Sequence, residues 1–90
     1  MANVLVQNIS GTSDNLPPRG YDSWLEFWAE KREARPFLCR RCGSLDSDLV
    51  GAHVMKVYGG NEWYIVPLCA RCNLTSGSFY VSEEDLVPVR

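Results

Sequence analysis

Short apolar runs alternate with polar, Gly- or Pro-containing stretches along this 90-residue chain. The first apolar run, residues 4–6 together with Ile9, is typical of a short strand. Residues 11–20 are rich in Gly, Ser, Asp, Asn and Pro, and the Pro17-Pro18 pair stops any regular element, so a loop is predicted there. We therefore expect residues 1–21 to form a flexible or partly ordered N-terminal segment.

The next apolar pattern has helical spacing and predicts a helix over residues 22–35. Ser23 and Glu26 have the Ser-x-x-Glu spacing of a capping box, with Asp22 as a competing cap. Pro36 ends the helix because it disfavours the α conformation at the preceding residue. The residues at this spacing form one stripe of the helix: Trp24, Leu25, Phe27, Trp28 and Lys31. The stripe could be a partner-binding surface, but we expect it to pack over the rest of the domain and to supply part of its core.

Two further runs alternate in the manner of strands, at residues 49–55 and 62–66. Gly59-Gly60-Asn61 predicts the turn between them, and Pro67 is expected to close the second strand. A short helix is predicted to open near residue 69 and to end at Gly77. Residues 79–81 and 86–87 are short apolar patches to which no element is assigned.

All four cysteines belong to two Cys-x-x-Cys pairs, Cys39 with Cys42 and Cys69 with Cys72. A two-residue spacer lets both thiolates of a pair reach one metal ion while turn amides donate to the sulfurs. Two such pairs complete the tetrahedral thiolate shell that structural zinc prefers. The 26 residues between the pairs are enough for a hairpin that returns the second pair to the first. The predicted cofactor is one structural Zn²⁺.

Other uses of cysteine fit the chain less well. Two disulfides would require an oxidising compartment, and residues 1–10 show no secretory signal. A thioredoxin-type redox centre needs a strand–helix context and does not account for two pairs. No apolar stretch approaches the ~20 residues of a membrane span. We expect a soluble cytoplasmic protein without a membrane partner and without an evident small-molecule substrate.

Charge narrows the choice of partners. The formal net charge is −2, and four thiolates with one Zn²⁺ bring it to about −4. That balance argues against binding of polyanions driven by net charge. Basic residues nevertheless gather within 31–41, and acidic ones at 83–85. The basic group is read equally well as a local binding face or as a solvated helix end.

Taken together, these elements predict a small α+β zinc-binding domain. A cysteine knuckle, a hairpin and a second pair at a helix start follow one another in the order of a treble-clef zinc finger. We expect one domain over residues 22–90, with the helix over 22–35 added at its N-terminal side.

Residues 38–77 resemble the HNH endonuclease family. The matching motifs are Cys39-x-x-Cys42, Gly51-Ala52-His53-Val54, Gly59-Gly60 and Ile65-Val66-Pro67-Leu68-Cys69-x-x-Cys72-Asn73. The resemblance implies a ββα-metal fold. It also implies that the hairpin histidine activates water as a general base, while a divalent ion binds the scissile phosphate between the hairpin and the following helix.

Carried over to this chain, the family's site is incomplete. His53, the only histidine, matches the general base, and Asn73 matches the last metal-ligand position. Ala52 stands where the family usually has an aspartate ligand, and it cannot bind a metal. The usual asparagine before the second pair falls near Tyr64, with Asn61 three residues earlier. Asp46 and Asp48 are the nearest upstream carboxylates.

Two functions follow from these residues. The first is a degenerate, non-catalytic HNH-like module that binds nucleic acid or protein, with Arg40, Arg41 and Arg71 as the candidate nucleic-acid contacts. The second is a metal-dependent HNH endonuclease with His53 as its base and a second divalent ion. Because a hard cation is normally held by carboxylates, the loss at Ala52 favours the first. The structural role of His53, packed in the hairpin, and of Asn73, bonded to nearby backbone, stays open beside both.

Overall fold

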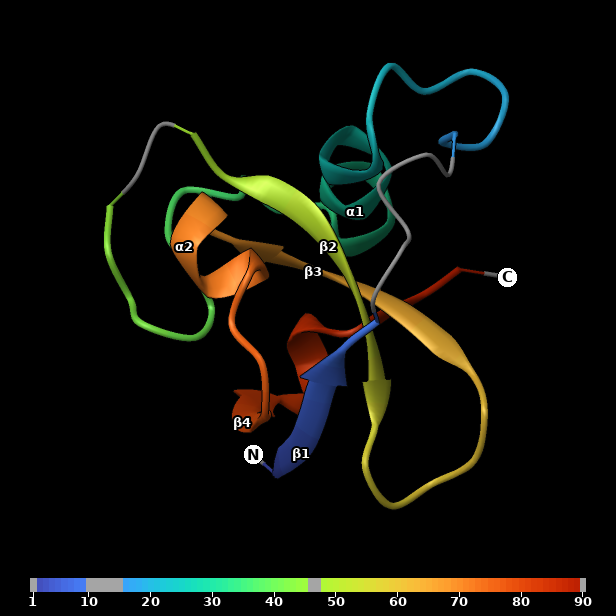
Figure 1. Cartoon of the computed structure of the whole chain (residues 1–90). Coiled ribbons are helices and arrows are strands. Elements are labelled where there is room, and N and C mark those ends of the chain that lie inside the picture. The colour runs from blue at the N-terminus through green and yellow to red at the C-terminus, as the bar shows by residue number, and fades with distance from the viewer. Residues whose placement is uncertain (1, 10–15, 46–47, 90) are drawn as a thin grey trace.

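Five antiparallel strands form one sheet in the order β4-β1-β2-β3-β5 (Figure 1). The computed structural model describes residues 2–9, 16–45 and 48–89 of the chain. The strands are β1 (Asn3–Asn8), β2 (Val50–Lys56), β3 (Trp63–Leu68), β4 (Ser78–Ser82) and β5 (Val87–Pro88). The helices are α1 (Trp24–Arg32), α2 (Ala70–Asn73) and the 3₁₀ turn η1 (Glu83–Asp85). The small α+β class expected from the sequence is confirmed.

The predicted hairpin is present as β2 and β3, which pair from Val50–Leu68 to Met55–Trp63. Gly59 and Gly60 both have positive φ in the turn, which explains the glycine pair at this point. Pro67 does not close the strand as predicted. It lies inside β3 opposite Gly51, and its carbonyl accepts a hydrogen bond from the Arg40 amide of the first cysteine knuckle.

The N-terminal segment contributes β1 to the middle of the sheet. β1 pairs with β2 on one side and with β4 on the other. Residues 16–18 have no regular structure, and 19–20 form a turn, as the composition predicted. The part of the predicted loop at residues 10–15 lies outside the described residues.

Helix α1 is shorter than the predicted 22–35. Ser23 is the N-cap, and its hydroxyl accepts a hydrogen bond from the Glu26 amide at 3.1 Å, so the predicted cap is confirmed. The helix ends at Arg32 because Glu33 adopts a left-handed conformation, in which its amide caps the carbonyls of the last turn. This cap stops the helix before Pro36 can do so.

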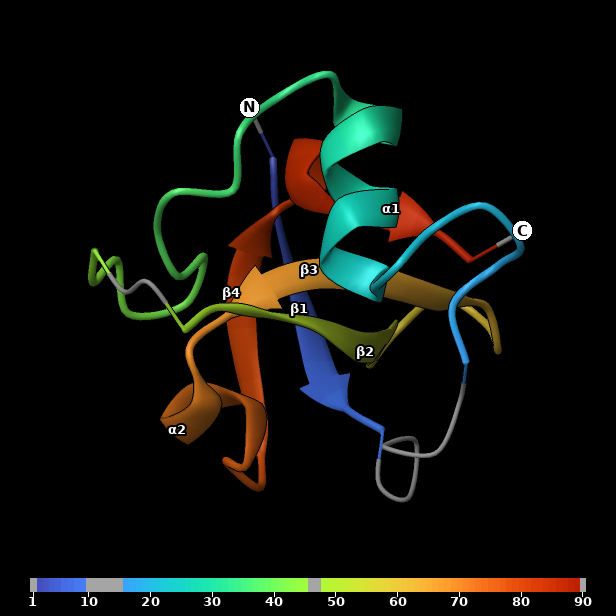
Figure 2. The same ribbon diagram turned by 90° about the horizontal axis from the view of Figure 1, so that it is seen from above.

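The two faces of the hairpin pack against different partners. Helix α1 covers one face, where Phe27 and Trp28 are buried with Ile65 and Val87. The other face belongs to a second core cluster, to which β1, β4 and three of the cysteines also contribute. We call this cluster the cysteine-side core, and its buried hydrophobic residues include Val6, Ala52, Val54, Val66, Leu68, Phe79 and Val81. Figure 2 shows α1 and α2 on opposite sides of the hairpin.

One glycine is required by the close approach of α1 to the sheet. A Cβ added at Gly51 would lie 2.6 Å from the Leu25 nitrogen and from the Trp24 carbonyl carbon. Both neighbours are backbone atoms, so they cannot move aside as a flexible side chain would. The helix can therefore rest on β2 only because residue 51 has no side chain.

The helices that the structure describes are short. None of them combines the length and the apolar character that crossing a membrane requires.

Candidate metal centre

The four cysteines meet at one point between the first knuckle and α2. Their sulfurs all lie within 4.8 Å of one another, although the two pairs are far apart in sequence. Cys39, Cys69 and Cys72 are buried and Cys42 is exposed, and all four are free rather than disulfide-bonded. The clustering that the sequence predicted is therefore present.

The first pair lies on a tight turn. The Gly43 amide donates to the Cys39 carbonyl at 2.8 Å, and the Cys39 amide donates to the Ser44 carbonyl at 3.0 Å. Gly43 has a φ of 75°, a conformation that glycine adopts without strain. The Cys42 amide donates to Cys39 Sγ at 3.5 Å. The turn thus places one backbone amide within hydrogen-bonding distance of a cysteine sulfur, as the Cys-x-x-Cys spacing predicted.

The second pair is placed by β3 and α2 and is fastened to the N-terminal strand. Cys69 is the N-cap of α2, and Cys72 lies one turn later on the helix. The Asn8 amide group, at the end of β1, donates to the carbonyls of Cys72 and Thr75 at 3.0 Å each. Sequence reasoning missed Asn8 because no local motif joins residue 8 to residue 72.

The four thiols differ in how readily they lose their protons. Cys42 Sγ is hydrogen-bonded to Ser44 Oγ at 3.2 Å, and this contact lowers the pKa of Cys42 to about 6. Burial raises the pKa of Cys72 to about 12, although the Arg41 guanidinium, 3.6 Å from its sulfur, opposes that rise. The crowded sulfurs therefore resist losing all their protons together unless a cation neutralises them.

The geometry fits zinc. In a tetrahedral site with Zn–S bonds of about 2.3 Å, the sulfurs are about 3.8 Å apart. Cys42 Sγ and Cys69 Sγ are separated by 3.9 Å. Four sulfur donors form a closed shell that leaves no position for water or substrate, which is the character of a structural site. All four sulfurs lie within 4.8 Å of one another, so the cluster could hold one metal ion, and its donor set is the one that structural Zn²⁺ prefers.

The three arginines predicted to contact nucleic acid differ in how they are held. The side chain of Arg40 is only 13% exposed, lies 3.4 Å from Asp85 and stacks on the Trp28 ring at 5.1 Å. Arg41 is exposed, but its guanidinium lies over the Phe79 ring at 5.4 Å. Arg71 is exposed on α2. Arg40 is thus held by Asp85 and Trp28, and of these three arginines Arg41 and Arg71 are the exposed ones.

His53 lies on the α1 face of β2, away from the buried face that contains the cysteines. Its side chain is 6% exposed. The Trp24 ring meets the imidazole edge to face at 4.7 Å, and the Trp63 ring does so at 5.9 Å. Its Nε2 atom is buried and has no hydrogen-bond partner among the described residues.

Because His53 is the only histidine in the sequence, the imidazole signals in an NMR spectrum belong to it, and its protonation can be followed directly. Burial lowers its pKa below 6.5, whereas the unfolded chain protonates it near that value. The unfolded state then binds more protons below pH 6.5, so the free energy of unfolding should fall as the pH drops through 6.5 and level off below the folded pKa.

We expect an NMR titration of the imidazole to give a pKa below 6.5, and His53→Asn to lose this part of the pH dependence. A measured pKa at or above 6.5 would contradict the burial of the side chain. The comparison with His53→Asn separates this effect from release of the metal in acid, which both chains share.

The remaining residues of the HNH comparison are dispersed. Ala52 is 2% exposed and its methyl group packs in the cysteine-side core. Asn73 ends α2 on the cysteine side, and Asn61 lies beside His53 in one hollow. Asp48 is exposed, and Asp46 lies outside the described residues. Within the described ranges, the cysteines are the one group of three or more His, Cys, Asp or Glu side chains placed to hold an ion.

Comparison with protein-family models, with curated proteins and with solved structures gave no match to this chain. The HNH resemblance consequently rests on the motifs within residues 38–77 alone. The structure itself establishes a small α+β domain, with a five-stranded antiparallel sheet, two helices and a cluster of four cysteines that could hold a metal ion.

Proposed function

We propose that this chain is a zinc-stabilised, HNH-like treble-clef module that binds a protein partner and does not cut nucleic acid. The observation that carries the proposal is the placement of the cysteine cluster. It joins a knuckle, the β2–β3 hairpin and the start of α2, in the order of a treble clef. A closed four-sulfur shell stabilises this arrangement and leaves no open coordination position for chemistry.

The absence of cleavage is supported by the residues at the family's catalytic positions. The methyl group of Ala52 fills a buried place where the family usually has a carboxylate. His53 is enclosed between two tryptophans on the opposite face of the hairpin from Ala52. A phosphoryl-transfer site needs a hard cation held by oxygen ligands beside the base, and these positions do not supply it.

A protein partner is favoured over a nucleic acid by the surface near the metal. Leu45 and Leu74, which follow the two cysteine pairs, are 79% and 83% exposed. The net charge of about −4 with zinc bound opposes a polyanion. Arg40, moreover, is neutralised by Asp85 and is not available to a phosphate.

The zinc-loaded protein should leave supercoiled plasmid uncut in Mg²⁺ and in Mn²⁺. The physical reason is the missing carboxylate ligand, without which the divalent ion that stabilises the transition state is not held. Gel electrophoresis of plasmid incubated with the protein and with His53→Ala measures this. Cleavage by the native chain that is lost in His53→Ala would refute the proposal, and cleavage common to both chains would indicate contamination.

A second candidate function, nucleic-acid binding, is favoured by the two exposed knuckle arginines. If they contact phosphates, Arg41→Ala with Arg71→Ala should weaken binding of a labelled DNA duplex. Loss of two contacts should also reduce the slope of log affinity against log salt by about 2. Fluorescence polarisation over a NaCl series tests this, with Arg19→Ala as the control for loss of charge elsewhere. Equal binding by the double variant would reject this candidate.

A further inference from the structure

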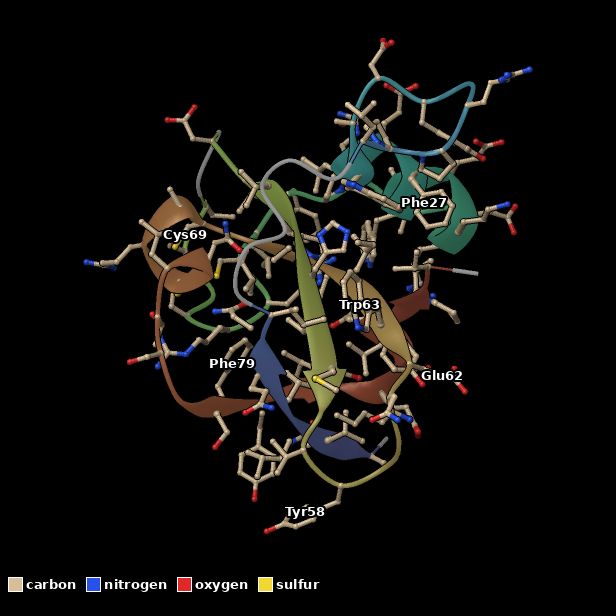
Figure 3. All side chains as sticks on the ribbon, turned by 45° about the vertical axis from the view of Figure 1, so that its right-hand side comes forward. Phe27, Tyr58, Glu62, Trp63, Cys69 and Phe79 are labelled. Atoms are coloured by element: carbon tan, nitrogen blue, oxygen red, sulfur yellow. The ribbon has the colours of Figure 1, made fainter. Side chains whose placement is uncertain are left out.

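A hollow of about 780 Å³ opens on the α1 side of the β2–β3 hairpin and contains no part of the metal centre. In Figure 3, Trp63 and Glu62 lie well apart from Cys69, so the hollow and the metal centre are separate features. Its walls come from α1, from the hairpin and from the C-terminal strand. We call it the Trp–His pocket, and it is lined by Trp24, His53, Asn61, Glu62, Trp63, Pro88 and Val89.

One residue of the pocket wall, His53, has a buried polar atom without a partner among the described residues. His53 is 94% buried, since 6% of it is exposed, and its Nε2 atom makes no hydrogen bond among the described residues. Buried polar groups in folded proteins are nearly always hydrogen-bonded, so this atom is one of the few exceptions among the described residues. A neutral imidazole with its hydrogen on Nδ1 offers Nε2 as an acceptor.

The walls favour a cation. Trp63 is 37% exposed, so part of its ring is open to solvent. Glu62 is exposed at the rim, where one carboxylate oxygen accepts from the Tyr64 hydroxyl at 3.4 Å. No Lys or Arg is among the described residues that line the pocket. The accessible indole face and carboxylate both attract a positive hydrogen-bond donor, and neither attracts an anion.

We propose that the Trp–His pocket binds an arginine side chain of a basic protein partner. The guanidinium would stack on Trp63 and donate to the Glu62 carboxylate, while the buried His53 imidazole forms a neutral part of the wall. Arginine suits this set better than lysine because its planar, weakly hydrated group carries five donors and stacks on aromatic rings. The acidic chain, with a formal charge of −2, favours the approach of such a partner. This inference rests on the proposed function as a protein-binding module.

The probe is the peptide acetyl-Gly-Arg-Gly-amide, with the citrulline peptide as its neutral counterpart of the same shape. The full zinc-loaded chain is titrated and followed by the NMR signals of the His53 imidazole and the Trp63 indole. We expect saturable shifts of both signals with the arginine peptide and an affinity at least about 5-fold lower with citrulline. Added NaCl should weaken only the arginine peptide.

Variants of the pocket make the test specific. Trp63→Leu and Glu62→Gln should each lower the affinity for the arginine peptide by about 3-fold or more. Tyr80→Leu, at an aromatic residue that is 64% exposed on β4, is the matched control and should leave the affinity unchanged. Unchanged zinc content and an unchanged backbone spectrum establish that each variant is folded.

Several results would overturn the proposal. Equal binding of the citrulline peptide, or undiminished binding by both pocket variants, would exclude recognition of the positive charge. Shifts of the same signals by adenosine monophosphate, without shifts by the arginine peptide, would make the pocket a nucleobase site instead. These failures differ from failure of the proposed function, because His53-dependent cleavage of plasmid would refute the binding module whatever the peptide does.

Discussion

Removal of zinc should unfold this protein. Structural zinc bound by four cysteines contributes about 10 kcal/mol or more to small domains, and the whole stability of a domain is about 5–15 kcal/mol. The metal would also join the first knuckle, which lies on a loop, to α2, which has only four residues and cannot be stable as an isolated helix. A chelator titration followed by circular dichroism should show loss of the folded signal, and refolding on addition of one equivalent of Zn²⁺.

Cys72→Ser should reproduce the effect of the chelator, because a hydroxyl does not replace a buried thiolate ligand. The matched control is Ser76→Ala in the loop that follows α2, at an exposed residue, which should behave like the native chain. Substitution by Co²⁺ gives a second reading, since four thiolates in a tetrahedron produce an intense visible spectrum. A chain that keeps its fold without metal, or binds zinc without Cys72, would contradict the four-cysteine site.

Trp28→Ala should be the most damaging substitution outside the metal centre. Trp28 is fully buried, and large-to-small changes of buried aromatic residues cost about 3–5 kcal/mol. Its indole nitrogen donates to the Asp85 carbonyl at 2.7 Å, so the variant also leaves a carbonyl without its partner. The ring supports Arg40, whose guanidinium lies 5.1 Å from it. The substitution therefore weakens the tie between α1, η1 and the first knuckle.

Urea denaturation at saturating zinc measures this cost. Trp28→Phe keeps most of the ring but loses the donor, and we expect it to cost about 1 kcal/mol for the hydrogen bond in addition to a smaller packing loss. Trp63→Ala, at a tryptophan that is 37% exposed, serves as the control for removal of an indole and should cost less. Equal destabilisation by Trp28→Ala and Trp63→Ala would show that α1 does not anchor the fold in this way.

Local patterns predicted the elements whose signals lie within a few neighbouring residues. The Ser-x-x-Glu spacing located the N-cap of α1 at Ser23, and the paired glycines located the hairpin turn. They failed at the C-terminus of α1, because a left-handed residue at Glu33 ended the helix before the proline that seemed to define its limit. They also left β4 and β5 unassigned, since short edge strands are stabilised by pairing with β1 and β3 rather than by their own composition.

At the candidate site, too, local patterns predicted some residues and missed those that come from distant parts of the chain. The spacing of the cysteines predicted their cluster, but the residues that support it come from elsewhere in the chain. Asn8 reaches Cys72 only because β1 enters the sheet beside β2. Arg40, predicted as a surface contact, is held by Asp85 and Trp28, which no sequence pattern places near it.

By itself, the sequence predicted that the four cysteines form one cluster, because a two-residue spacer within each pair suits coordination of one ion by both thiolates. It also determined the hairpin between the pairs and the start of α1. Only the tertiary structure decided on which face of the hairpin each side chain lies. That choice follows from strand alternation and register, which set Ala52 in the cysteine-side core and His53 among the tryptophans. These positions depend on contacts between residues far apart in the chain, and a local sequence pattern does not predict such contacts.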